Sequence, residues 1–229
     1  MIIRYARSGG HPPPPDREIL TIDEDGTFTM WRSIGSAVQP SSPVGRFAGR
    51  LDDQTLESLK SAIVEVALVG DITTKLKPGS AVVNIDTGLV KARMGIHDEP
   101  ENAWSQLVAI MKGLLKQLTT KPEAAISLTV SDDGRRAHLE HLGQQPLELD
   151  LSQLTVYAVL WEGYKIVAEW TFSTSDSEEE IPIVVDTNWQ MDLPFDHHFE
   201  PGDNQRVVAY VTFSIFNEDR LVPVRLTSS

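Results

Sequence analysis

The chain has 229 residues, of which 41% are hydrophobic, and this predicts a folded protein long enough for two domains. Because it has no cysteine, no signal-peptide core and no apolar run of roughly 18 residues, we expect a cytoplasmic protein without disulfides, thiol chemistry, cysteine-bound metal or a membrane span. Most of the net charge of −13 falls on residues 124–229, where 18 Asp and Glu stand against 6 Lys and Arg. This excess disfavours nucleic acid and membrane surfaces as partners and favours either plain solubility or a basic protein partner.

Alternation of apolar and polar residues predicts several short strands in the first half of the chain. The turn sequences Glu24-Asp25-Gly26 and Asp86-Thr87-Gly88 are expected to close two hairpins. Pro12–Pro15 predict a stiff, extended loop or, alternatively, a ligand for an aromatic groove. Ser33–Gly45 is rich in Ser, Pro and Gly and is expected to be a second loop. The expected strands are Ile2–Ala6, Glu18–Asp23, Thr27–Arg32, Arg46–Leu51, Ala81–Ile85 and Leu89–Met94.

Two helices are expected in the same half. Apolar residues recur at helical spacing over residues 53–67, and Asp52 or Asp53 can cap that helix with its carboxylate. Asp98-Glu99-Pro100-Glu101 resembles a capping box and predicts the start of a second helix. The apolar stripe of this second helix is expected to pack into the core and comprises Trp104, Leu107, Val108, Met111, Leu114, Leu115 and Leu118.

After Pro122 the pattern changes to a period of two and shows no further helical stretch. Short strands with regular turns predict a β-sandwich of immunoglobulin-like size, although its topology stays open. We therefore expect an α+β domain over residues 1–120 followed by an all-β sandwich domain over residues 124–229. The expected strands of the second domain are Ala125–Val130, Arg135–Leu142, Leu154–Trp161, Tyr164–Phe172, Ile181–Thr187, Arg206–Ile215 and Arg220–Leu226.

Motifs that carry a known mechanism are missing from the sequence: there is no phosphate-binding loop, dinucleotide fingerprint, zinc-peptidase helix or serine-nucleophile elbow. We therefore expect no cofactor and no enzymatic activity. His138 and His141 would share a face in a helix, but in the predicted strand they point to opposite faces and do not form a metal site. The segment Asp196–Asp203, which includes His197 and His198, is either a solvated loop or a metal-assisted acid–base site.

Two stretches of the second half are candidates for binding a protein partner. Glu178, Glu179 and Glu180 form an acidic block, which is either solvated or a docking site for a basic partner. Trp189, Phe195 and Phe199 lie in a segment bounded by acids and prolines, and such aromatic side chains are typical of binding hot spots. The alternative is that residues 189–195 alternate because they face the sandwich core, and we favour this interpretation.

The opening residues carry a family resemblance. Ile3-Arg4-Tyr5-Ala6-Arg7-Ser8-Gly9-Gly10 resembles the start of emfourin-type domains, which are bacterial protein inhibitors of thermolysin-like metallopeptidases. The pattern of residues 1–120, a strand and hairpin before a helix and then a second hairpin and helix, is similar to a broader group of small bacterial domains. The sequence departs from the emfourin pattern after the two glycines, where His11 and four prolines replace an apolar residue.

These observations favour a bacterial, non-enzymatic protein-binding protein, and leave its oligomeric state open. Arg4 and Arg7 join the acidic and aromatic residues above as candidate contacts, because they lie in the emfourin-like opening. The resemblance implies a second hypothesis, a proteinaceous inhibitor with a peptidase as partner. A metal-dependent enzyme that uses Asp196–Asp203 is the third.

Overall fold

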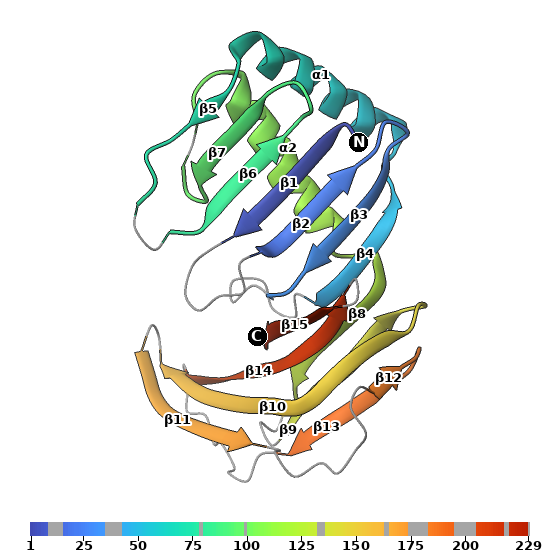
Figure 1. Cartoon of the computed structure of the whole chain (residues 1–229). Helices are drawn as coiled ribbons and strands as arrows, with labels where there is room; N and C mark the ends of the chain where they lie inside the picture. The colour runs from blue at the N-terminus through green and yellow to red at the C-terminus, as the bar shows by residue number, and fades with distance from the viewer. Residues whose placement is uncertain are drawn as a thin grey trace. The chain divides into compact units, whose positions relative to one another are not determined.

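The computed structural model shows a mainly β fold with two helices among the residues it describes (Figure 1). Neither of these helices has the length and apolar character that a membrane crossing requires. The described residues are 1–8, 16–34, 43–77, 80–98, 100–131, 136–162, 165–173, 183–194, 205–217 and 220–228.

The chain divides into two compact units. Unit 1 consists of Met1–Arg32 and Arg46–Pro122, and unit 2 consists of Ser33–Gly45 and Glu123–Ser229. The segment Ser33–Gly45, which lies inside the first domain of the sequence prediction, therefore clusters with unit 2.

Unit 1 contains a sheet with the strand order β4-β3-β2-β1-β6-β7-β5. Neighbouring strands from β3 to β7 pair antiparallel, and the short β5 pairs parallel with β7. Both predicted hairpins are confirmed, since β2 pairs with β3 and β6 pairs with β7 across the expected turns. The strands are β1 (Ile3–Ser8), β2 (Asp16–Ile22), β3 (Thr27–Arg32), β4 (Val44–Arg50), β5 (Ile72–Thr73), β6 (Val82–Asp86) and β7 (Lys91–Gly95).

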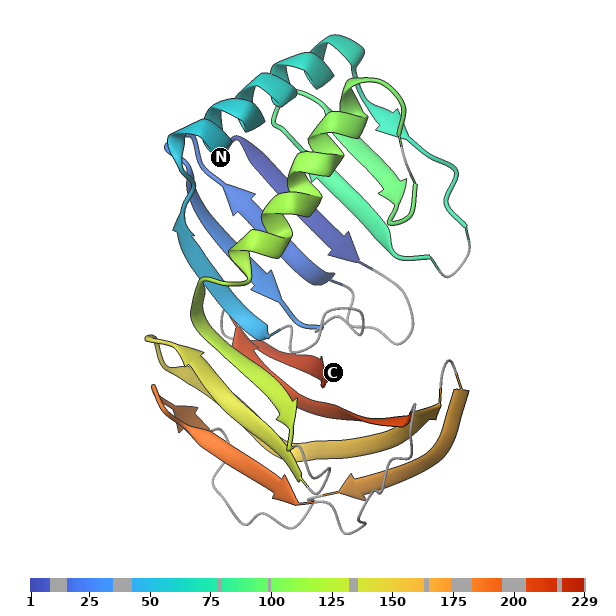
Figure 2. The same cartoon turned by 180° about the vertical axis from the view of Figure 1, so that it is seen from behind.

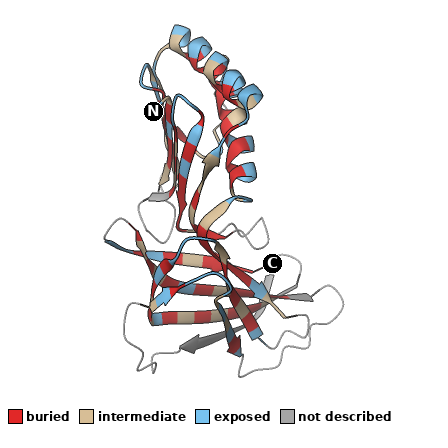
Figure 3. Ribbon diagram, turned by 90° about the vertical axis from the view of Figure 1, so that its right-hand side faces the viewer, coloured by how far each residue is buried: buried red, intermediate tan, exposed pale blue. Residues whose placement is uncertain are grey.

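Two helices, α1 (Asp53–Val69) and α2 (Ala103–Leu118), lie on one face of this sheet. Figure 2 shows both helices in front of the sheet, and Figure 3 shows that the exposed residues of α1 face outward. The whole predicted stripe of α2, from Trp104 to Leu118, is buried. The core of unit 1 therefore lies between the helices and the inner face of the sheet. Its largest fully buried side chains include Trp104, Phe28, Phe47, Ile3, Leu20, Ile22, Leu59, Ile85, Met94, Leu107 and Met111.

The two helices begin differently from each other. Asp52 caps α1, because its carboxylate accepts a hydrogen bond from the Thr55 amide at 2.8 Å. The capping box predicted at Asp98 is wrong, since α2 begins only at Ala103 and its cap is Asn102. The Asp98 carboxylate instead accepts hydrogen bonds from the Gly95 amide at 2.8 Å and from the Thr74 hydroxyl. The Asp98 carboxylate, which the local sequence pattern predicted as the cap of the helix, thus binds Thr74 and Gly95 instead.

Unit 2 contains strands of two sheets. In one, the order is β13-β9-β8, and in the other it is β11-β10-β14-β15, with β12 paired to the start of β10. The strand β10 begins seven residues before the predicted Leu154, and its pairing with β14 shifts register between Asp150 and Thr155. The strands are β8 (Pro122–Val130), β9 (Arg136–Gly143), β10 (Leu147–Glu162), β11 (Lys165–Ser173), β12 (Ile183–Val185), β13 (Gln190–Pro194), β14 (Gln205–Asn217) and β15 (Arg220–Thr227).

Close backbone contacts explain why Ser33–Gly45 belongs to unit 2. The Arg225 amide donates a hydrogen bond to the Ser33 carbonyl at 2.9 Å, next to a β-bridge between Ile34 and Arg225. At the other end of the segment, Gly45 has φ +133°, and a Cβ atom there would lie 2.7 Å from the Ala125 Cα. Only glycine tolerates both this backbone angle and this approach to β8.

Candidate functional site

The sheet of unit 1 has one face that the helices do not cover. Alternation along β1 places Tyr5 on the helix side, where it is buried, and Arg4 on the open side, where it is exposed. The same alternation places Asn84 on the open side of β6 and Arg93 on the open side of β7. Polar and charged side chains from three neighbouring strands therefore share one surface.

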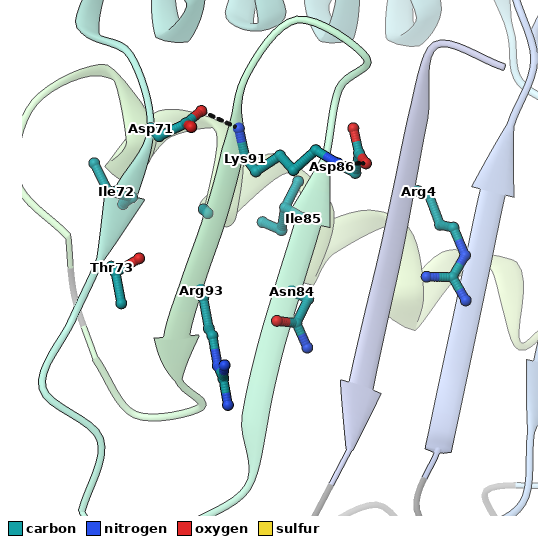
Figure 4. Close-up of a pocket in the computed structure, with 10 residues that line it drawn as sticks. Arg4, Asp71, Ile72, Thr73, Asn84, Ile85, Asp86, Lys91 and Arg93 are labelled. Carbon is teal, nitrogen blue, oxygen red and sulfur yellow. Dashed lines mark hydrogen bonds and ion pairs between the residues drawn. The ribbon is translucent and has the colours of Figure 1, made fainter.

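A hollow of about 320 Å³ lies on this open face (Figure 4). Strand β1 contributes one side chain to it, and β5, β6 and β7 contribute most of the others. Among its charged groups, three cations stand against two carboxylates. The lining residues are Arg4, Asp71, Ile72, Thr73, Asn84, Ile85, Asp86, Lys91, Ala92 and Arg93.

The two carboxylates of the hollow are already held by internal contacts. Asp86 forms an ion pair with the Lys91 ammonium at 2.9 Å and accepts a hydrogen bond from the Gly88 amide at 2.8 Å. These contacts hold the pKa of Asp86 below its usual value, and the hydrogen bond from Lys91 has the largest effect. The Asp86 carboxylate in turn raises the pKa of Lys91. Asp71 accepts a hydrogen bond from the Lys91 backbone amide at 2.8 Å. Both acids therefore stabilise the turn and edge of the β6–β7 hairpin.

The two arginines of the hollow are placed differently. Arg4 and Arg93 are exposed, and neither guanidinium has a hydrogen bond or ion pair in the described part of the chain, although the charge of Arg4 helps to lower the pKa of Asp86. Figure 4 shows both side chains and the Asn84 amide directed toward the same end of the strands. Each guanidinium carries five N–H donors, so this surface has unused capacity to bind an anion.

Arg7, the other arginine of the opening, lies on the opposite face of β1 from Arg4. The two positions are three apart along the strand, and Arg7 is paired in register with Glu18 and Val83. Glu18 is buried and accepts a hydrogen bond from Arg32 Nε at 2.8 Å and a second from Arg32 Nη2. Burial and the Glu18 carboxylate raise the pKa of the Tyr5 hydroxyl beside this group. The cluster is part of the interior of unit 1, whereas Arg4 is part of its surface.

The binding candidates of unit 2 are described only in part. Trp189 is half-buried, and Leu193 is 4% exposed, which agrees with the interpretation that this alternation faces a core. The carbonyl of Trp189 accepts a hydrogen bond from the His141 amide at 3.0 Å, and the residues that follow it form β13, which pairs antiparallel with β9. The remaining candidates lie outside the described residues and stay predictions: Phe195, Phe199, Glu178, Glu179, Glu180 and the Asp196–Asp203 segment with His197 and His198.

The two histidines of β9 lie on opposite faces, as the strand period predicted. His138 is partly exposed, and its Nδ1 lies 2.8 Å from a carboxylate oxygen of Asp192, which also pairs with Arg136 at 3.1 Å. These two contacts hold the pKa of Asp192 below its usual value. His141 is buried. In the described part of the chain, no group of three or more His, Asp and Glu side chains is arranged to hold a metal ion.

His141 makes the stability of unit 2 depend on pH. Desolvation lowers the pKa of its ring below 6.5, although the Gln145 backbone and the Asp186 carboxylate oppose this shift. The folded protein therefore binds the proton more weakly than the unfolded chain does. Stability from this group is fully present above about pH 6.5 and is lost as the pH falls below that value.

Between about pH 6.5 and pH 5, we expect the free energy of unfolding of unit 2 to fall less steeply in His141→Leu than in the wild type, because the variant has no ring to protonate. Urea unfolding followed by hydrogen exchange in β9 and β14 would measure the effect at each pH. His97→Gln, at an exposed position of unit 1, is the matched control and should keep the wild-type slope. An unchanged slope in His141→Leu would contradict the assignment.

Sequence reasoning missed most of the open face. Residues 82–94 predicted a hairpin, and the polar alternation of Asn84, Asp86, Lys91 and Arg93 was a usable sign that one side of it meets solvent. Nothing in the sequence showed that β1 pairs with β6, which brings Arg4 to this hairpin across about 80 residues.

Comparisons of the sequence with known proteins assign it to no family. The candidate site therefore depends on the register, exposure and charge of the residues described above. No protein-family model matches the sequence, and no curated protein matches it.

Proposed function

We propose that this is a non-enzymatic protein-binding protein and that the open face of the unit 1 sheet is its contact surface. One observation carries this proposal: a sheet whose other face is packed against two helices presents a hollow with two exposed arginines, whose guanidinium groups make no hydrogen bond or ion pair among the described residues. In the same hollow, Asp86 and Lys91 form an ion pair with each other, so their charges are already used within the fold. Unpaired arginines around a hollow are typical of a surface that meets a partner.

For unit 2 we infer a β-sandwich of immunoglobulin-like size, beside an α+β domain in unit 1. Apolar side chains alternate toward the interior on one strand of each sheet, as Ala137 and Leu139 do in β9 and Val211 and Phe213 do in β14. This alternation is what two sheets require when their inner faces share a core. Such modules commonly serve as binding scaffolds, which supports the same function by analogy of fold alone.

Site-specific crosslinking tests the contact surface, because a chain without cysteine can be labelled at one introduced thiol. Thr73 is exposed at the edge of the hollow, and Gln106 is exposed on α2, on the helix side of the sheet. With a photoactivatable crosslinker attached to Thr73→Cys, we expect one covalent adduct of defined mass between this chain and a partner protein from the cells that produce it. Gln106→Cys should give little of the same adduct. Equal yields from the two positions, or no discrete adduct from either, would contradict the proposal.

Inhibition of thermolysin-like metallopeptidases is the second candidate function. The resemblance of residues 3–10 to the start of emfourin-type domains supports it. The element order of unit 1, with a strand and hairpin before α1 and a second hairpin before α2, fits the broader group of small bacterial domains that the sequence also resembles. Titration of the intact chain against a thermolysin-type peptidase, with an unrelated serine peptidase as control, tests this function. Selective, stoichiometric inhibition that is weakened in Arg4→Gln is the expected result. Full peptidase activity at micromolar excess, with the protein uncleaved, would remove this candidate.

A further inference from the structure

We propose that the hollow on the open face of unit 1 binds an acidic peptide segment, and that Arg4 and Arg93 bind its carboxylates while Asn84 binds its backbone. This inference rests on the proposed protein-binding function and names the chemistry of the partner. It follows from the register of three strands, from the pairing of the nearby acids and from the size of the hollow.

The register places the two arginines on either side of β6. Arg4 on β1 lies opposite Asp86, and Arg93 on β7 lies opposite Asn84, so the arginines are two strands and two residues apart. With strands about 4.8 Å apart and a rise of about 3.4 Å per residue, their Cα atoms are separated by about 12 Å. Asn84 lies between them on the central strand, and all three side chains extend toward the same end of the sheet (Figure 4).

Charge selects an anionic partner. The carboxylates of Asp71 and Asp86 are occupied by Lys91, through its backbone amide and its ammonium group respectively. Arg4 and Arg93 therefore keep their donors for an outside group, and a guanidinium binds a carboxylate through two parallel hydrogen bonds. The Asn84 side chain offers a donor and an acceptor, which is the combination that a peptide group requires.

The size of the hollow favours a few side chains of a peptide over a large cofactor. A volume of about 320 Å³ is at the small end of the roughly 300–1,000 Å³ of small-molecule pockets. An extended peptide places alternate side chains about 7 Å apart on one side. Two arginines whose Cα atoms lie about 12 Å apart can reach inward to carboxylates at that spacing, because each side chain spans several bonds.

Fluorescence anisotropy with the full chain tests this inference. The probe is a labelled hexapeptide that carries glutamates at two alternate positions, and its glutamine analogue is the uncharged comparison. We expect the acidic peptide to bind and the analogue to bind much more weakly. Arg4→Gln and Arg93→Gln should each weaken binding about tenfold. Lys112→Gln/Lys116→Gln removes as much charge as Arg4→Gln/Arg93→Gln, but from exposed positions on α2, and should leave the affinity within about twofold.

Three results of the peptide titrations would overturn the inference. They are equal binding of the acidic peptide and its glutamine analogue, equal loss of affinity in the Lys112→Gln/Lys116→Gln control, and no binding of the acidic peptide. Displacement by inorganic phosphate at equal affinity would also overturn it, because it would indicate a general anion site. The crosslinking experiment at Thr73 separates this failure from that of the proposed function, since an adduct there without acidic-peptide binding would keep the surface and reject only its ligand.

Discussion

Glu18→Ala is expected to destabilise unit 1 by about 3–5 kcal/mol, because it leaves a buried guanidinium without its counter-charge. Glu18 is 5% exposed and Arg32 is 8% exposed, and the carboxylate accepts both described hydrogen bonds from that arginine. Arg7 lies in register beside Glu18, and its Nε is buried without a hydrogen-bond partner in the described part of the chain. Removing the acid therefore leaves two arginines near one another in a poorly solvated place.

Amide hydrogen exchange in β2 and β3 measures this loss locally, with β14 of unit 2 as an internal reference. Glu57→Ala is the matched control, since it removes an acid from an exposed ion pair with Lys60 and should change stability by less than about 1 kcal/mol. Glu18→Met/Arg32→Met removes both charges and should recover part of the loss. A cost for Glu18→Ala as small as that of the Glu57 control would show that water reaches the pair.

Local patterns predicted the elements of unit 1 well because each depends on neighbours in sequence. The turn at Glu24-Asp25-Gly26 needs a residue with positive φ, and Gly26 provides it at +85°. The strand after it, β3, has the expected bounds, whereas β2 begins two residues earlier and ends one residue earlier than expected. Helical spacing likewise predicted α2's buried stripe in full. The start of α2 could not be read in this way, because Thr74, 24 residues away, binds the Asp98 carboxylate.

In unit 2 one strand segment was visible in the sequence and was still missed. Leu147, Leu149 and Leu151 alternate with polar residues and are all buried in the first part of β10, ahead of the predicted start at Leu154. The placement of Ser33–Gly45 had no such signal. This placement depends on backbone contacts with β8 and β15. A polar, glycine-rich segment has no apolar periodicity from which the strands that it contacts could be predicted.

The candidate site shows the same division between local and non-local information. Arg4 was selected from the sequence for its place in the opening motif, whereas Asn84 and Arg93 become candidates only when the pairing of β1 with β6 is known. Arg7 was selected with Arg4, yet strand alternation alone was sufficient to place the two on opposite faces. A binding surface on a sheet is built across strands, so its composition depends on the strand order that a single sequence does not specify.

Trp104→Ala is expected to destabilise unit 1 by about 3–5 kcal/mol, as truncation of a buried aromatic side chain leaves a large cavity. Trp104 is fully buried in the first turn of α2, and its indole Nε1 donates a hydrogen bond to the Gly70 carbonyl at 3.0 Å. Gly70 is the residue at which α1 ends, with φ +87° and its amide bonded to the Val66 carbonyl. One side chain therefore both fills the core and joins the start of α2 to the end of α1.

Trp104→Phe separates these two roles. This variant keeps most of the apolar contact and removes the hydrogen-bond donor. We expect it to lose less stability than Trp104→Ala, because the cavity is smaller, although the Gly70 carbonyl is left unpaired. Leu68→Ala is the matched control because Leu68 is 80% exposed on α1, and its loss should change stability by no more than about 0.5 kcal/mol. Urea unfolding and hydrogen exchange in α1 and α2 give the comparison. If Trp104→Phe costs as much as Trp104→Ala, the hydrogen bond to Gly70 rather than core volume holds the helices together, and the cavity argument is wrong.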